Sequence, residues 1–140
     1  MKKNESIQQI MTKNIRTITL KTKLSETRSL FAELGVHHLP VTEGDTLIGL
    51  FSFSDFLRID AGELYNQNDK QADVILDSLS SVKEVMTKNL ITILTNTTIR
   101  EANEKLAEGR FHSLPVVDNN QKLVGIVTTT DLLRYFQKNY

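Results

Sequence analysis

An internal repeat constrains the fold of this chain more than any other feature. The stretch MTKNIRTI at residues 11–18 returns as MTKNLITI at residues 86–93, 75 positions later, with six of the eight letters identical. The offset stays at 75 up to Val41 and Val116. One residue is inserted in the second copy beyond this point, and the register then continues at an offset of 76. Paired positions outside these stretches include His37 with His112, Leu39–Val41 with Leu114–Val116, Gly49 with Gly125, and Asp55 with Asp131. A register of this length predicts one structural unit that is present twice.

Each copy carries the signals of the same five elements, in the order β-α-β-β-α. A short apolar stretch (15–20 or 90–94) precedes a helix, which in the second copy opens with the capping-box pair Thr98 and Glu101. Two strands follow around the turns EGD and DNNQ and form a hairpin, and a last helix begins at SDFLR or TDLLR. The predicted fold class is α+β. The two pseudo-symmetric repeats should pack together, because one such unit is too small to bury a full core.

The repeat also predicts the domain organisation. Residues 1–60 form repeat 1, residues 61–81 a linker and residues 82–140 repeat 2, and together they make one tandem module. The front of the linker is polar. Its end carries Val74, Ile75 and Leu79, which predict a weakly helical segment that covers an apolar surface.

Composition argues against several function classes. Lys plus Arg equals Asp plus Glu at 17 each, so no net field attracts nucleic acid or an anionic membrane, and no apolar run approaches the 18 residues of a membrane span. The chain has no cysteine, its three histidines lack metal-ligand spacing, and neither a Gly-rich phosphate loop nor a nucleophile motif is present. We therefore expect neither a metal site nor catalysis. Because the N-terminus lacks an apolar signal core, we expect a cytoplasmic location.

The blocks MT…TI, HxLPVxD/E and GhhT/SxxDhL (h, apolar), each present in both copies in the same order, resemble a tandem cystathionine-β-synthase (CBS) domain pair. The resemblance implies two β-α-β-β-α repeats that pack through their sheets about a pseudo-two-fold axis, with two clefts between them. It implies adenosine-containing ligands such as AMP, ADP, ATP or S-adenosylmethionine, and no required cofactor. It also implies a disc-like homodimer that regulates a separate, unknown protein partner and is not an enzyme.

The resemblance also places ligand-binding residues at matching positions. The ribose-binding Ser/Thr-x-x-Asp motif falls on Ser52 and Asp55 in the first copy and on Thr128 and Asp131 in the second. The other implied contacts are Ser54 and Thr130 before each Asp, Leu50 and Ile126 in the adenine pocket, His37 and His112 near phosphate, and the edge residues Asn14, Ile15, Arg16, Asn89, Leu90 and Ile91.

Side-chain chemistry is compatible with these placements and also with a simpler interpretation. A carboxylate can accept hydrogen bonds from both ribose hydroxyls, and a helix N-terminus attracts phosphate. The same Ser/Thr-x-x-Asp pattern is also a good helix cap, so a ligand-free interaction scaffold with vestigial clefts is the alternative function. His37 and His112 can equally be structural, and Arg58 and Arg134 are expected to pair with the Asp three residues earlier at the surface.

Two kinds of sequence difference refine the expected ligand binding: departures from the family pattern, and differences between the two copies. Strong polyphosphate binders often carry Arg after the matching His, where this chain has His38 and Ser113. We therefore expect a monophosphate, diphosphate or nucleoside ligand. Phe51 and Phe53 of the first copy become Val127 and Thr129 in the second, which predicts unequal clefts, with the Phe-rich one more crowded.

Overall fold

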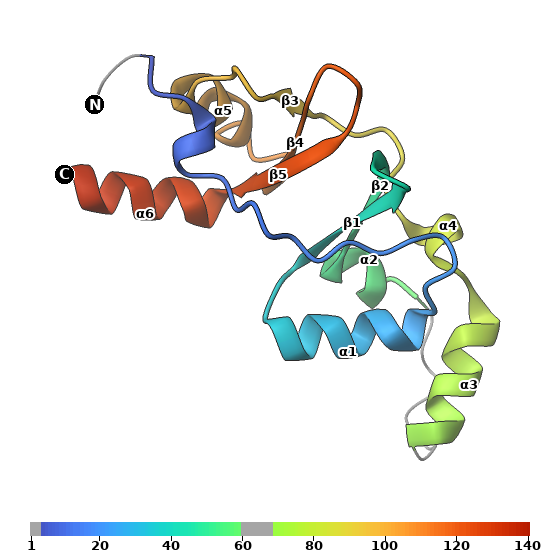
Figure 1. The fold of residues 1–140 in the computed structure, drawn as a ribbon. Helices are drawn as coiled ribbons and strands as arrows, with labels where there is room; N and C mark the ends of the chain where they lie inside the picture. Colours follow the sequence, from blue (N-terminus) through green and yellow to red (C-terminus); the bar gives the residue numbers. More distant parts are fainter. Residues whose placement is uncertain (1–3, 60–68) are drawn as a thin grey trace. The chain divides into compact units, whose positions relative to one another are not determined.

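A computed structural model describes residues 4–59 and 69–140 (Figure 1). The chain divides into two compact units. Unit 1 comprises the chain up to Ile15, the short stretch Asp45–Leu47, and Ile91–Tyr140. Unit 2 comprises Arg16–Gly44 and Ile48–Leu90. Each unit therefore combines the body of one repeat with the opening segment of the other.

Unit 2 is built on the body of the first repeat. Helix α1 (Leu24–Leu34) precedes strands β1 (His38–Glu43) and β2 (Thr46–Ser52), which form a two-stranded sheet, and α2 (Phe53–Leu57) follows directly. Helices α3 (Asp69–Leu79) and α4 (Val82–Val85) complete the unit, and α3 contacts α1. The predicted first strand of this repeat is reduced to a parallel bridge between Ile18 and Val41.

Unit 1 is built on the body of the second repeat. The 3₁₀ turn η1 (Ile7–Gln9) opens it, and β3 (Ile93–Leu94), β4 (Ser113–Val117) and β5 (Leu123–Thr128) form a sheet in that order. Strands β3 and β4 are parallel, and β4 and β5 are antiparallel. Helix α5 (Ile99–Leu106) lies between β3 and β4 in the chain, and α6 (Thr129–Asn139) follows β5 (Figure 1). The predicted order β-α-β-β-α is confirmed in full in this repeat, and the α+β class is confirmed for the chain.

Helices α2, α5 and α6 begin where their capping residues predict. Thr98 is the N-cap of α5 and accepts a hydrogen bond from the Glu101 N–H at 3.1 Å. The residues at i, i+3 and i+7 of the two equivalent helices are buried, as their spacing predicts. They are Leu24, Thr27 and Phe31 in α1, and Ile99, Ala102 and Leu106 in α5. No helix in the described ranges is both long enough and apolar enough to cross a membrane.

The opening segments of the repeats are exchanged between the two cores. Ile7 belongs to repeat 1 but is fully buried in the core around α5, β4, β5 and α6. Val82 belongs to repeat 2 but is fully buried in the core around α1, β1 and β2. Each core is therefore completed by the N-terminal segment of the other copy.

Two methionine–glycine contacts fix these exchanged segments. A Cβ atom on Gly125 would lie 2.6 Å from the Met11 Sδ, and one on Gly49 would lie 2.5 Å from the Met86 Sδ. Both glycines lie on the hairpin strand that the opening segment crosses, so the absent side chain gives the methionine its space. Met11 and Met86 are partly buried and pack against these two cores.

The linker differs from its prediction in the residues that it buries. Its end forms helix α3, as predicted, but Val74 is 69% exposed and Leu79 is also exposed. Ala72 and Leu76, four residues apart, are the buried side chains instead. The predicted polar front of the linker lies outside the described residues.

Candidate functional site

The start of α6 carries the Ser/Thr-x-x-Asp motif of the second repeat in a closed capping box. The Thr128 hydroxyl accepts a hydrogen bond from the Asp131 N–H at 3.1 Å, and the Asp131 Oδ2 accepts one from the Thr128 N–H at 2.9 Å. Both side chains are half-buried. Within the described part of the chain the Asp131 Oδ1 has no hydrogen bond or ion pair. The cap thus orients the carboxylate and leaves one oxygen able to accept a ligand hydroxyl.

The start of α2 carries the Ser/Thr-x-x-Asp motif of the first repeat, and its carboxylate has different contacts from that of Asp131. The Ser52 hydroxyl and the Asp55 carboxylate form the same reciprocal box, at 3.0 Å and 2.8 Å. Asp55, however, is only 2% exposed, and its Oδ1 accepts a hydrogen bond from the Arg58 guanidinium. The expected pairing of Arg58 with Asp55 is therefore confirmed, but its carboxylate is buried and not at the surface. The matching expectation for Arg134 with Asp131 is wrong, because no such ion pair forms.

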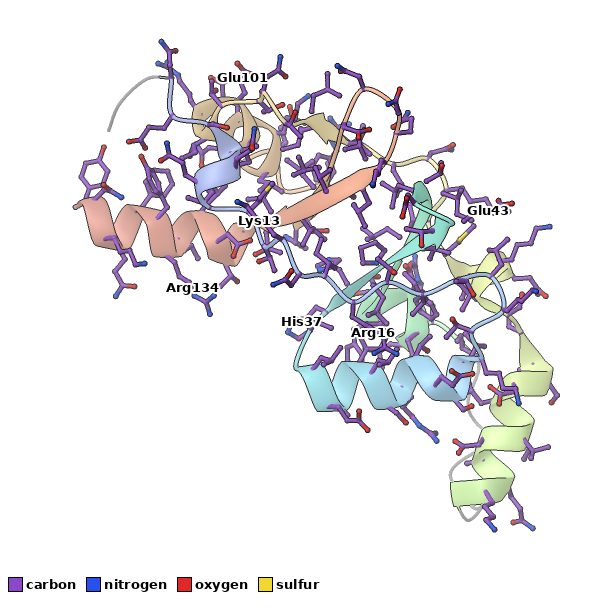
Figure 2. All side chains as sticks on the ribbon, viewed as in Figure 1. Lys13, Arg16, His37, Glu43, Glu101 and Arg134 are labelled. Carbon is purple, nitrogen blue, oxygen red and sulfur yellow. The ribbon has the colours of Figure 1, made fainter. Side chains whose placement is uncertain are left out.

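His37 and His112 occupy equivalent positions in the two repeats, and the backbone carbonyl of each accepts a hydrogen bond from the first residue of the following helix. The His37 carbonyl accepts a hydrogen bond from the Phe53 N–H at 2.8 Å, and the His112 carbonyl accepts one from the Thr129 N–H at 3.1 Å. Both histidine side chains are exposed, as are Ser54 and Thr130. Figure 2 shows His37 between α1 and β1. Each histidine backbone thus anchors the first residue of the following helix.

The exchanged segments bring the edge residues to the opposite repeat. Thr12 and Ile126 exchange two backbone hydrogen bonds, at 2.8 and 3.0 Å, and Leu50 and Thr87 do the same, at 3.0 and 2.9 Å. The predicted ligand-binding residues are therefore grouped by structural unit and not by repeat. Unit 1 contains Asn14, Ile15, Ile91, His112, Ile126, Thr128, Thr130 and Asp131, and unit 2 contains Arg16, His37, Leu50, Ser52, Ser54, Asp55, Asn89 and Leu90.

Aromatic rings crowd the helix start in unit 2. Phe31 makes edge contacts with Phe51, Phe53 and Phe56, with ring centroids 5.5–6.4 Å apart. Phe53 also stacks on Phe56 at 6.2 Å and contacts the His37 ring at 6.4 Å. Val127 and Thr129 of unit 1 occupy the positions equivalent to Phe51 and Phe53, and neither is aromatic. The two motifs therefore sit in unlike surroundings.

Sequence reasoning missed two features of this arrangement. It did not foresee that Thr12 and Thr87 pair with the strands of the opposite repeat. It also did not foresee that Arg58 saturates a buried carboxylate. The one available signal was the Phe-rich start of α2, which distinguishes the two copies. No group of three or more potential metal ligands occurs among the residues that the structure describes.

Comparisons with known proteins agree with the repeat. The model of the CBS domain family matches residues 7–62 and again residues 82–138. Among solved structures, the crystal structure of CBSX2, a protein of Arabidopsis thaliana, in complex with AMP is 28% identical, with a TM-score of 0.79. That match covers 96% of this chain and 98% of the other.

Two sequence relatives are considerably longer than this chain. Uncharacterized protein MJ1232 of Methanocaldococcus jannaschii is 34% identical over 87% of this chain and 36% of its own length. Inosine-5'-monophosphate dehydrogenase of Thermoplasma acidophilum is 31% identical over 89% of this chain and 22% of its own length. The chain thus spans about a third or less of these relatives. With both repeats matched by the family model, the chain belongs to the CBS domain family.

Proposed function

We propose that this chain is a regulatory module that binds an adenosine-containing ligand through Asp131 and modulates a separate protein, without catalysing a reaction itself. The observation that carries the proposal is the carboxylate at the start of α6, which is oriented by one oxygen and open at the other. The bound AMP in the crystal of CBSX2, a protein of the same family and fold, supports an adenosine ligand.

The proposed contacts follow from the chemistry of unit 1. Ribose hydroxyls donate hydrogen bonds to the Asp131 Oδ1, and the exposed Thr130 hydroxyl adds a further donor and acceptor. The first turn of the 11-residue helix α6 favours a nearby phosphate. Ile126, although only 6% exposed, lies at the proposed apolar wall for a purine. The Asn14 N–H and the carbonyls of Asn14 and Ile15, next to Thr12, which pairs with Ile126, supply a donor and acceptors. Polyphosphate binders often carry Arg after the residue that matches His112, and this chain has Ser113 there. Because a triphosphate needs several fixed cations, we favour AMP over ATP.

The regulatory part of the proposal rests on where similar segments occur. A segment similar to this chain forms 22% of the inosine-5'-monophosphate dehydrogenase of Thermoplasma acidophilum, which is the arrangement expected of an accessory module attached to an enzyme. We propose that this chain acts in the same accessory way on a separate partner, as a cytoplasmic homodimer.

A second candidate function is a protein-interaction scaffold whose ligand sites are vestigial. The observation in its favour is that Leu57 and Leu133, which occupy equivalent positions in the two repeats, are 65% and 63% exposed. Apolar side chains exposed at the same repeat position suit a contact with another protein.

A thermal-shift panel separates the two candidates. AMP, ADP, ATP, adenosine and S-adenosylmethionine are each added to the wild type, to Asp131→Asn and to Asp45→Asn. The amide introduced by Asp131→Asn keeps an acceptor for the Thr128 N–H, so the cap survives, whereas the exposed Asp45 lies outside the proposed site. A ligand at 100 times its Kd should add about 2.7 kcal/mol to the stability of the wild type and of Asp45→Asn, and much less to that of Asp131→Asn. If none of the five compounds shifts the wild type, the scaffold function stands instead.

A further inference from the structure

We propose that Arg58 closes the carboxylate of the first repeat, so that each chain has one working ligand site, at Asp131. The inference rests on the proposed adenosine-binding function and adds which of the two motifs performs it. Arg58, which lies outside the Ser/Thr-x-x-Asp motif, thereby decides which of the two motifs can bind a ligand.

The state of Asp55 is the first step. Its Oδ2 accepts the Ser52 N–H and its Oδ1 accepts the Arg58 guanidinium, so both oxygens are in use. The side chain is 2% exposed, whereas the Arg58 side chain above it is 73% exposed. A ribose hydroxyl would have to compete with a charge-assisted hydrogen bond for a carboxylate that is almost fully covered. The first-repeat carboxylate is therefore closed by a residue that itself faces solvent.

The second repeat carries a hydroxyl residue, an Asp and an Arg at the same spacing, but one oxygen of its carboxylate stays open. Asp131 is half-buried, and Arg134, three residues later, forms no ion pair with it. Figure 2 shows the Arg134 side chain extending away from α6. An arginine at this spacing is therefore not sufficient to close the motif.

Helix geometry favours the contact of Arg58 with Asp55 over that of Arg134 with Asp131. Helix α2 is five residues long and ends in i to i+3 hydrogen bonds, from Arg58 N–H to the Asp55 carbonyl at 3.3 Å and from Ile59 N–H to the Phe56 carbonyl at 3.1 Å. In such a 3₁₀ turn the side chains at i and i+3 eclipse, which places Arg58 over Asp55. Helix α6 continues to Asn139, so Arg134 lies inside a regular α-helix, where positions i and i+3 are offset around the axis.

The aromatic cluster reinforces the difference. The Phe53 ring, directly after Ser52, packs between Phe56, Phe31 and His37, and the first turn of α2 is held by these contacts. Thr129 takes the equivalent place at the start of α6 and donates a hydrogen bond from its hydroxyl to the His112 carbonyl at 3.4 Å. The short helix that carries Arg58 is thus packed by aromatic contacts, and the equivalent turn in the second repeat carries a smaller polar residue.

Calorimetric titration with AMP tests the inference by its stoichiometry. The proteins are the wild type, Arg58→Ala, the matched control Arg134→Ala, and the double variant Arg58→Ala/Asp131→Asn. We expect one AMP per chain for the wild type and for Arg134→Ala, two for Arg58→Ala, and one for the double variant. Circular dichroism melting verifies folding, and Arg58→Ser replaces Arg58→Ala if the alanine variant does not fold.

The outcomes separate this inference from the function on which it rests. Two sites in the wild type, or one site in Arg58→Ala that disappears with Asp131→Asn, would overturn the role of Arg58 and leave the adenosine-binding function intact. Absence of AMP binding in both the wild type and Arg58→Ala would overturn the proposed function together with the inference.

Discussion

At the scale of single residues, Glu5 and Tyr135 tie the start of the chain to its last helix. Tyr135 is a buried residue whose hydroxyl donates a hydrogen bond to the Glu5 carboxylate, and this bond, with desolvation and the Glu5 charge, raises the pKa of Tyr135 to about 12. Folding therefore favours the neutral phenol. Its contribution to stability is complete below the ordinary tyrosine pKa of about 10 and is lost as the pH rises from about 10 to about 12.

An absorbance titration at alkaline pH measures this pKa. In a Tyr65→Phe/Tyr140→Phe background, Tyr135 is the only tyrosine, and we expect its ionisation to be centred near 12. Adding Glu5→Ala should move the midpoint toward 10, because both the acceptor and the negative charge are removed. A midpoint that Glu5→Ala leaves unchanged would mean that burial alone sets the pKa.

Gly125 gives a second prediction at this scale. Its missing side chain makes room for Met11, and a Cβ atom would also approach the Thr12 carbonyl oxygen to 3.1 Å. We expect Gly125→Ala to lower the free energy of unfolding by about 1–3 kcal/mol through overpacking. In a Met11→Ala background the same change should cost clearly less, and equal costs in the two backgrounds would show that the methionine contact is not the cause.

At the scale of elements, the linker helix α3 caps helix α1. The residue before α1 is Lys23, whose side chain provides no capping hydrogen bond. Instead Asp77 of α3 accepts hydrogen bonds from the Ser25 N–H at 2.9 Å and the Ser25 hydroxyl at 2.7 Å. Asp73 of the same helix pairs with Arg28. Helix α3 is therefore attached by polar contacts at both of these positions, as well as by the burial of Leu76.

Urea denaturation of Asp77→Ala tests this cap. Alanine is the better helix former, by up to about 0.7 kcal/mol, so propensity alone would stabilise the variant. We nevertheless expect a net loss of about 0.5–1 kcal/mol, because the Ser25 N–H and hydroxyl lose their acceptor. Lys70→Ala, at an exposed position of α3, is the control and should be nearly neutral. A variant as stable as the control would show that the cap contributes nothing.

The same elements show what the sequence could and could not predict. Hairpins and helix starts were predictable, because turn residues and caps such as Thr98 act locally. The buried face of α3 was not, because the surface of α1 selects Ala72 and Leu76 over the more apolar Val74. The difference between Asp55 and Asp131 was also hidden, since it depends on a 3₁₀ ending of α2 and not on the identity of any residue in the motif.

At the scale of the whole molecule, the exchange of opening segments follows from the symmetry of the repeat. Ile7 and Val82 occupy equivalent positions with similar side chains, so the hydrophobic pattern alone permits either segment to complete either core. The structure pairs each with the opposite repeat. The sequence thus predicted the repeats but could not predict which segment completes which core.

Hydrogen exchange gives the prediction at this scale. Ile7→Ala should cost about 2–5 kcal/mol and should raise exchange rates in residues 91–140, which share its core, more than in residues 16–44 of its own repeat. Val82→Ala should do the reverse. Faster exchange confined to residues 16–44 in Ile7→Ala would contradict the exchange of segments.

The central claim is that an adenosine ligand binds at the start of α6. Its most direct test is an amide ¹H–¹⁵N correlation spectrum of the wild type titrated with AMP. We expect saturable shifts concentrated at residues 126–131 and 12–15, with residues 50–55 little changed. Shifts centred on residues 50–55, or none at saturating AMP, would contradict the claim.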